Sequence, residues 1–222
     1  MKKVIFVGIA LIMAGCTSAP PTVQTGPDAE VSYDGLHVVD NSVFKMAWAD
    51  PDADWARYDQ YISGGGVYEF RAVKKGNNTY SARSSQTEFW IDDADRAKLE
   101  EETSNIFREE LAKSERFTMT DTPEANVLII RGALHDIVSN VPPDMVGRGE
   151  VFLSSVGEAT LILEAVDSLS GEVIFRAVER RAAAPTTGGV RANSVTTWSE
   201  VRRMVRRWAT TLQKGMDSLP TE

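Results

Sequence analysis

The fold class follows most directly from one stretch, Thr160-Leu-Ile-Leu-Glu-Ala-Val-Asp-Ser-Leu-Ser-Gly-Glu-Val-Ile-Phe-Arg-Ala-Val178. Its two apolar halves have the length of strands, and the polar residues between them are typical of a turn. Gly171 can adopt the positive φ that such a turn needs. The stretch therefore predicts an antiparallel hairpin with a loop of about four residues. We expect Glu164 and Arg176 to pair across the two strands.

Several other segments have strand character. Residues 127–138 begin with Val-Leu-Ile-Ile and then alternate between apolar and polar side chains, which predicts a strand. The three glycines at 64–66 precede another candidate strand, at residues 67–73, and indicate a bend or bulge where it begins. The shorter strands are expected at residues 67–73, 88–91 and 117–120.

Two segments predict helices. Asp92 or Asp93 is a suitable N-cap for a helix that extends to about Lys113. The sequence Thr197-Trp-Ser-Glu200 matches a capping box at the start of a closing helix. Strands and helices are thus mixed along the chain. We predict an α+β fold, in which two main helices pack on a mostly antiparallel sheet of about four to six strands.

The N-terminus has the pattern of an export signal. Lys2 and Lys3 precede an apolar run, residues 4–14, which is shorter than the roughly 20 residues of a membrane-spanning helix. The run ends in Leu11-Ile-Met-Ala-Gly-Cys16 and contains the only cysteine of the chain. This end resembles the lipobox of bacterial lipoproteins, although Met13 stands where leucine is more usual. The alternative is an ordinary signal peptide with an incidental cysteine.

The lipobox resemblance implies that Cys16 is acylated, becomes the first residue of the mature chain and anchors it to a membrane through lipid chains. Thr17 stands where an aspartate would signal retention in the inner membrane, which favours the periplasmic face of the outer membrane. We expect a signal peptide at residues 1–15, a flexible proline-containing tether at 16–33 and a single α+β domain at 34–217. The net charge of −8 argues against nucleic acid as a partner.

Three segments together resemble an uncharacterised bacterial lipoprotein family, the proteins of unknown function DUF3313. They are Pro51-Asp-Ala-Asp-Trp-Ala-Arg-Tyr58, Ala125-Asn-Val-Leu-Ile-Ile130, and Val156-Gly-Glu-Ala159 through the turn that ends at Val173. These motifs form turns and strands and carry no reactive groups. The resemblance therefore implies a lipoprotein domain, but it supplies no activity.

No pattern of residues indicates catalysis, a cofactor or a metal. Asp50, Asp52 and Asp54 have the spacing that opens a calcium loop, but Trp55 and Tyr61 occupy the positions where glycine and glutamate are required. The two histidines, His37 and His135, lie far apart in the sequence and outside any metal-ligand pattern. The three glycines at 64–66 lack the lysine of a phosphate loop. We expect a protein that is not an enzyme and holds no cofactor.

Two surfaces are candidates for partner binding. The closing helix should carry apolar residues on one side and four arginines on the other, which could bind carboxylates or phosphates or could pair with local acids such as Glu200. The long loop at 141–155 should expose apolar side chains, unless these pack against the sheet. The candidate residues are Arg202, Arg203, Arg206, Arg207, Met145 and Phe152.

These features favour a non-enzymatic lipoprotein at the periplasmic face of the outer membrane, whose domain binds another envelope protein or takes part in envelope assembly. Two alternatives remain open. One is an envelope hydrolase or small-ligand-binding domain, whose acidic residues would converge only in the fold. The other is a structural lipoprotein that assembles with copies of itself into a homo-oligomer.

Overall fold

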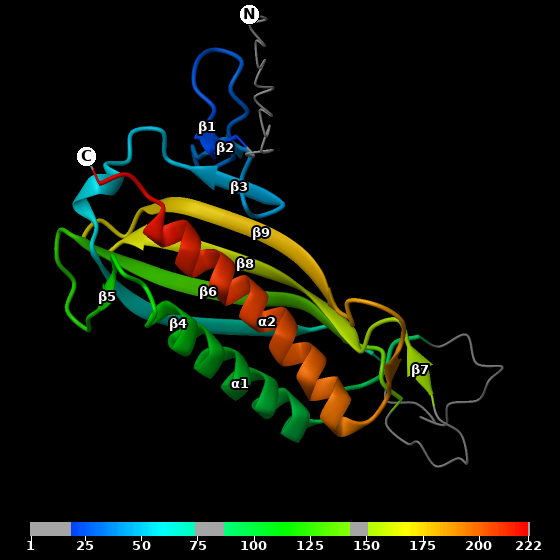
Figure 1. The fold of residues 1–222 in the computed structure, drawn as a ribbon. Coiled ribbons are helices and arrows are strands. Elements are labelled where there is room, and N and C mark those ends of the chain that lie inside the picture. The colour runs from blue at the N-terminus through cyan, green and yellow to red at the C-terminus, as the bar shows by residue number, and fades with distance from the viewer. Residues whose placement is uncertain (1–18, 74–86, 143–150, 222) are drawn as a thin grey trace, which may run out of the picture.

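The computed structural model describes residues 19–73, 87–142 and 151–221. Cys16, Met145, the polar loop expected at 74–86 and most of the loop expected at 141–149 lie outside these residues. One eight-stranded sheet has both helices on the same face (Figure 1). The strand order is β1-β2-β3-β9-β8-β6-β4-β5. A separate two-stranded ribbon pairs β7 (Phe152–Leu153) with β10 (Val190–Arg191).

The predicted hairpin forms the centre of the sheet. It consists of β8 (Gly157–Asp167) and β9 (Val173–Ala183), and Gly171 in its turn has a φ of +75°. Glu164 and Arg176 are direct neighbours across the strands, and Arg176 Nε lies 2.9 Å from Glu164 Oε1. The hairpin and its ion pair are therefore confirmed.

The α+β class with two helices is confirmed, but the sheet differs from the predicted one. It has eight strands and is mixed, so the expectation of a mostly antiparallel sheet of four to six strands is wrong. β4 (Gln60–Phe70) runs parallel to β6 (Val127–Ser139), and the two-residue β5 (Thr118–Met119) runs parallel to β4. The reason is that α1 connects β4 to β6 as a crossover, which returns the chain in the same direction.

The additional strands come from the N-terminal part of the chain. β2 (His37–Asp40) and β3 (Met46–Ala49) extend the sheet from the free edge of β9, and β1 (Thr22–Val23) pairs with β2. Part of the segment expected to be a tether is therefore hydrogen-bonded to the sheet. The segment expected as a strand at 88–91 instead makes a single bridge, between Phe89 and Ser139.

Both helices are capped by a side chain at the N-terminus. α1 (Asp93–Leu111) begins after Asp92, whose Oδ1 accepts the N–H of Asp95 at 2.7 Å. α2 (Ser194–Asp217) begins after Asn193, whose Oδ1 accepts the N–H of Thr196 at 2.9 Å. The predicted capping box at Thr197 is wrong, because the helix starts a turn earlier and the Thr197 hydroxyl is buried within it.

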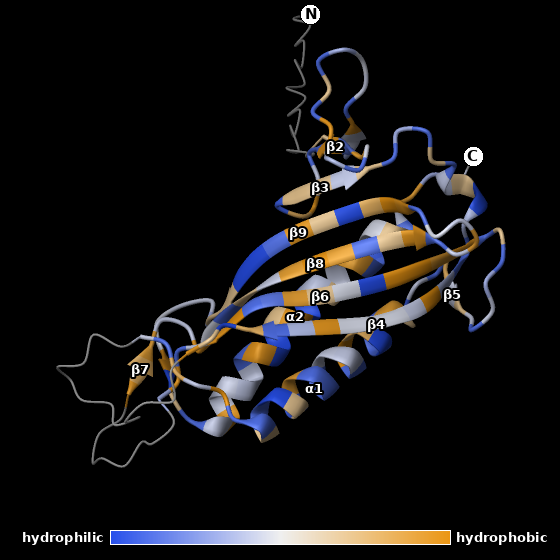
Figure 2. Ribbon diagram, turned by 180° about the vertical axis from the view of Figure 1, so that it is seen from behind, coloured by the Kyte–Doolittle hydropathy of each residue, from blue (hydrophilic) through white to orange (hydrophobic). Residues whose placement is uncertain are grey.

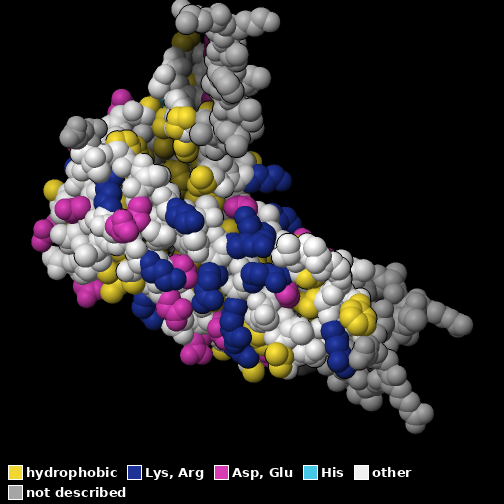
Figure 3. Space-filling view, viewed as in Figure 1, with side chains coloured by type: hydrophobic (Ala, Val, Ile, Leu, Met, Phe, Trp, Pro, Cys, Tyr) yellow, Lys and Arg dark blue, Asp and Glu magenta, His cyan; other side chains and the backbone are white. Residues whose placement is uncertain are grey.

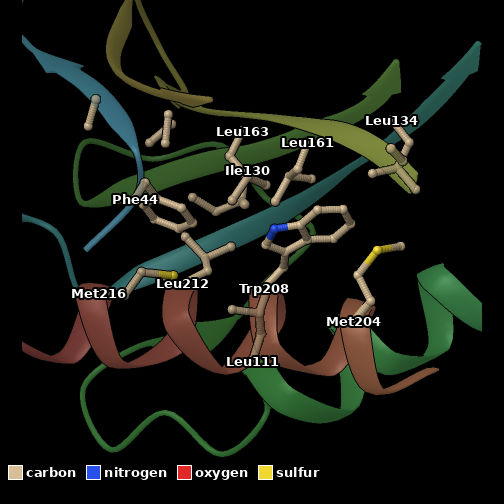
Figure 4. Packing of buried hydrophobic residues seen from close by; sticks show 14 of the residues in the cluster. Phe44, Leu111, Ile130, Leu134, Leu161, Leu163, Met204, Trp208, Leu212 and Met216 are labelled. Carbon is tan, nitrogen blue, oxygen red and sulfur yellow. The ribbon is translucent and has the colours of Figure 1, made fainter. Parts of the chain in front are cut away.

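The core lies between the helices and one face of the sheet. Trp208 of α2 is fully buried, and Figure 4 shows its ring between α2 and the strands that carry Leu161 and Ile130. The strands alternate between hydrophobic and hydrophilic residues, as Figure 2 shows from behind. The polar side chains of this rear face form ion pairs, such as those of Arg180 with Asp136 and Glu158. Neither helix of the described residues has an apolar stretch long enough to span a bilayer.

The carboxylate of Asp167 connects the hairpin turn to the segment that enters β4. It accepts hydrogen bonds from the Tyr58 hydroxyl at 2.8 Å and from the backbone N–H groups of Ser170 (2.8 Å) and Leu169 (3.0 Å). Arg57, at the end of the 3-10 helix Trp55–Arg57, forms an ion pair with it. Burial raises the pKa of Asp167, but these hydrogen bonds outweigh burial and lower the pKa to about 2.

The acid stability of the fold should depend on this carboxylate. The pKa of Asp167 is lower in the folded chain than its ordinary value of 3.8, so its stabilisation is present above about pH 4 and is lost as the pH falls toward 2. The stabilisation amounts to about 2 kcal/mol. We expect Asp167→Asn to lower the free energy of unfolding by about that amount at pH 7 and to flatten its dependence on pH between 4 and 2. Urea unfolding at several pH values measures this. Asp52→Asn, in an exposed turn, is the control, and equal pH profiles for the two variants would contradict the prediction.

Two glycines in the central strands should respond in opposite ways to substitution by alanine. A Cβ at Gly157 would overlap the carbonyl oxygen of Val138, whereas a Cβ at Gly132 would meet Leu163 Cδ2 at an ordinary 3.5 Å. Gly157→Ala should therefore destabilise the fold by about 2 kcal/mol. Gly132→Ala should stabilise it by about 0.5 to 1 kcal/mol, because glycine is unfavourable within a strand. Chemical denaturation of both variants tests this, and a loss of stability in Gly132→Ala would contradict it.

Candidate functional site

A cavity of about 170 Å³ lies between α1 and the edge of the sheet at β4. We call it the α1–β4 groove. The two elements lie side by side in both ribbon views (Figures 1 and 2). The lining is mainly apolar. From the sheet it includes Tyr61, Ser63, Gly66, Tyr68, Ile130, Gly132, Leu134, Leu161 and Leu163, and from α1 it includes Thr103, Ser104, Phe107, Arg108 and Leu111.

The groove exists because small residues face the helix at this edge of the sheet. Gly66 of β4 is the direct neighbour of Gly132 of β6, so neither strand has a side chain at this point. Ser63 contributes only a hydroxymethyl group near the same place. On either side, Ile130 and Leu134 of β6 are buried against the core. The chain therefore leaves a space beneath α1 that ordinary strand residues would fill.

Two hydroxyl groups lie in or beside the groove. The side chain of Thr103 is only 5% exposed, and its Oγ1 has no hydrogen-bond partner among the described residues. A buried hydroxyl without a partner destabilises a fold by about 1 to 3 kcal/mol. The Tyr68 hydroxyl lies at the rim, 3.3 Å from the Glu100 carbonyl oxygen and 3.4 Å from Ser104 Oγ. The groove thus combines an apolar lining with a few polar groups, as ligand sites commonly do.

Arg108 gives the rim a positive charge. Its guanidinium is exposed and donates to Asn105 Oδ1 at 3.0 Å, and no carboxylate pairs with it in the described part of the chain. Arg202, Arg203 and Arg206 of α2 have acidic partners, and Arg108 differs from these three. An anionic group of a ligand could bind here without displacing an internal ion pair.

A second cavity, of about 90 Å³, lies at the other end of the helices and bears on the enzyme alternative. Asp95 and Glu158 both line it, and burial, with a contribution from Asp92, raises the pKa of Asp95. Glu158, however, pairs with Arg180, whose partners lie on the rear face of the sheet. The two carboxyl groups therefore do not face one another as a general acid and base would.

The predicted arginine surface consists largely of internal ion pairs. Figure 3 shows a band of Lys and Arg side chains over the helices, interspersed with acidic ones. Arg202 binds Glu102 of α1 through two contacts, of which Nε to Oε2 is 2.9 Å. Arg203 pairs with Glu200 and donates to the Ala184 carbonyl oxygen. Arg206 lies 3.2 Å from Glu110 and 3.5 Å from Glu109. Of the four, Arg207 alone has no acidic partner among the described residues, so the arginines mainly join α2 to α1 and to its own turns.

The other predicted residues lie apart from the groove. Phe152 is in β7, at the far end of the molecule, and its side chain is 62% exposed. His37 Nδ1 lies 2.7 Å from the Gln24 carbonyl oxygen, and His135 pairs with Glu69. The two histidines lie on β2 and β6, which are four strands apart in the sheet order. No cluster of three potential metal ligands occurs in residues 19–73, 87–142 and 151–221. The Asp50 carboxylate accepts the backbone N–H of Asp52, as in a turn.

The groove was not predicted from the sequence, although two glycine positions that help to form it were visible there. The bulge predicted at the glycine run is present, since the pairing of β4 with β6 shifts between Ser63 and Gly66. Gly132, in the middle of a strongly apolar strand, was the other available signal. Neither residue indicates in the sequence that the two face each other beneath a helix.

Comparison with solved structures finds resemblances at low identity. A PelC dodecamer from Paraburkholderia phytofirmans is 13% identical, with 70% of this chain and 89% of that chain covered, at a TM-score of 0.34. Protein XCC0632 from Xanthomonas campestris is 9% identical, with 74% and 86% covered, at a TM-score of 0.39. The hypothetical protein CT253 from Chlamydia trachomatis is 10% identical, with 71% and 97% covered, at a TM-score of 0.37. These scores are too low to support conclusions about this chain.

No curated protein matches the chain. The family described as proteins of unknown function, DUF3313, matches residues 29–212, which include all strands of the large sheet except β1 and most of both helices. The resemblance found in the sequence is therefore confirmed, and the chain belongs to the DUF3313 family.

Proposed function

We propose that this protein is a lipoprotein of the outer membrane that faces the periplasm and binds an envelope partner in the α1–β4 groove. In this proposal, acylated Cys16 anchors the chain, and the domain is a binding module and not an enzyme. The N-terminal pattern of two lysines, a short apolar run and a single cysteine supports the anchor.

The single observation that supports a binding role is the groove itself. It is an apolar concavity with a buried unpartnered hydroxyl and an unpaired cation at its rim. Its lining, among the described residues, contains serine, threonine and tyrosine hydroxyls but no carboxylate, histidine or cysteine. Such a lining offers no carboxylate or imidazole that could activate a hydroxyl as a general base, whereas it suits recognition of an apolar group.

The anchor can be tested by one substitution. Cys16→Ser should abolish the incorporation of radiolabelled palmitate and move the protein from the membrane fraction to the soluble periplasmic fraction, because acyl chains would supply most of the membrane affinity. Arg207→Gln, which removes an exposed charge elsewhere, is the control and should leave both readouts unchanged. The proposed anchor would be contradicted if the wild-type protein incorporates no palmitate, or if the Cys16→Ser variant remains in the membrane fraction.

The groove can be tested in cells by photo-cross-linking the full-length protein. A photoreactive amino acid at Ser104, on the rim, should capture one dominant envelope protein, whereas the same group at Leu169, exposed on the hairpin turn, should not. Gly132→Val fills the groove from below and should reduce the Ser104 product severalfold. Mass spectrometry of the cross-linked species measures this. Equal products from both positions, or a product unaffected by Gly132→Val, would contradict binding in the groove.

A further inference from the structure

We infer that the partner binds the α1–β4 groove as an extended peptide segment that adds to the edge of β4. In this arrangement one large apolar side chain of the segment enters the cavity, and a neighbouring carboxylate pairs with Arg108. The inference rests on the proposed function, since it specifies the chemistry and geometry by which the binding module holds its partner.

The outer edge of β4 is open over most of its length. β5 pairs only with Gln60 and Tyr61, where the Thr120 N–H donates to the Tyr61 carbonyl oxygen at 2.9 Å. Beyond Tyr61, no described residue pairs with this edge, although the strand continues to Phe70. Unpaired backbone groups along an edge are satisfied most completely by another extended chain.

This edge also lacks two of the usual protections against strand addition, although a bulge interrupts it and Glu69 carries a charge. Natural edges are often shielded by lysine or proline, or by a covering segment. The sequence from Ser63 to Phe70 contains neither residue type, and Val67 is 64% exposed on it. The pairing of β4 with β6 shifts between Ser63 and Gly66 and again between Tyr68 and Phe70, so the regular part of this edge beyond the glycines is Gly66–Tyr68. Three residues are enough for one short added strand.

The size of the cavity fits one large apolar side chain. Its volume is about 170 Å³, close to the roughly 150 Å³ of an engineered apolar cavity that binds benzene. A phenylalanine or leucine side chain is of comparable size. Side chains of an extended segment alternate between the two faces of a sheet. One residue in the segment can therefore point into the groove while both its neighbours point to the rear face.

The polar groups of the groove indicate the remaining chemistry. The Thr103 hydroxyl, which has no partner among the described residues, could form a hydrogen bond with a polar atom of the partner segment. The peptide backbone next to the apolar side chain of that segment supplies such an atom. Arg108 is one helical turn from Ser104, which lies beside Tyr68, and it lines the same cavity. Its guanidinium has no carboxylate partner among the described residues, so charge complementarity favours an acidic residue or a C-terminal carboxylate in the partner segment.

The inference can be tested with peptides and the full-length protein in detergent. The probe is a phage-displayed library of random ten-residue peptides, followed by synthesis of the enriched sequences. We expect enrichment of phenylalanine or leucine at one position, with aspartate, glutamate or the C-terminus close to it. N-methylation of alternate backbone amides in such a peptide should weaken binding by about tenfold or more, because it removes hydrogen bonds to the edge and adds a steric clash. Hydrogen exchange should show new protection between Gly66 and Phe70.

Matched variants separate the contributions. Gly132→Val should abolish peptide binding, whereas Thr160→Val, on the rear face of the sheet and outside the lining of the cavity, should not. Arg108→Gln should weaken the binding of acidic peptides by about two- to fivefold and should reduce the salt dependence of that binding. Arg108→Lys should retain most of the affinity. Arg207→Gln, an exposed arginine of α2, is the control for nonspecific charge and should have no effect.

Several outcomes would overturn the inference. The library could yield no enriched sequence, or the enriched peptides could tolerate N-methylation at every position. Bound peptide could also give no protection from hydrogen exchange in β4, or peptide binding could survive Gly132→Val. The proposed function fails separately, if Ser104 captures no specific partner in cells. A specific Ser104 product together with insensitivity to N-methylation would retain binding in the groove and reject strand addition alone.

Discussion

The carboxylate of Asp167 joins the turn of the central hairpin to the segment that enters β4, near the edge of the sheet. It closes the β8–β9 turn through two backbone N–H groups, and it also accepts the hydroxyl of Tyr58, just before β4 begins. The start of β4 is held on both sides, because Gln60 and Tyr61 pair with β5 and with β6. Through Tyr58 and Arg57, the central hairpin adds a further contact just before this point. One buried anion therefore contributes to the position of the edge, and with it to the position of the groove.

The elements that were predictable from sequence are those whose signals are local. The hairpin turn, its Glu164–Arg176 pair and the Asp92 cap each depend on residues less than fifteen positions apart. The parallel pairing of β4 with β6 depends instead on the path of α1 between them, and strand patterns do not reveal direction. The first three strands are short, so their apolar residues provided too little periodicity to distinguish them from a loop.

The candidate site was less predictable than the fold for two physical reasons. The local pairing expected with Glu200 is present at Arg203. The partners of Arg202 and Arg206, which are Glu102, Glu109 and Glu110, lie about a hundred positions earlier in the chain, so only the packing of the two helices shows these ion pairs. The groove, in contrast, is created by side chains that are missing at Gly66 and Gly132. A missing side chain gives no periodic signal, and its significance depends on what faces it across the sheet.

The groove also makes sense of features that are unfavourable for stability alone. Glycine within a strand weakens it, a cavity loses dispersion contacts, and an unpartnered buried hydroxyl has lost its water without gaining a new partner. All three coincide near Gly132 and Thr103. The unpartnered hydroxyl alone does not distinguish this place, because Trp208 Nε1 in the neighbouring core also lacks a partner among the described residues. A fold under selection for stability alone could fill part of this space by placing alanine at position 132, where a Cβ would meet Leu163 Cδ2 at an ordinary 3.5 Å. Their coincidence beneath α1, beside the open edge of β4, is the arrangement expected of a surface whose contacts are completed by another chain.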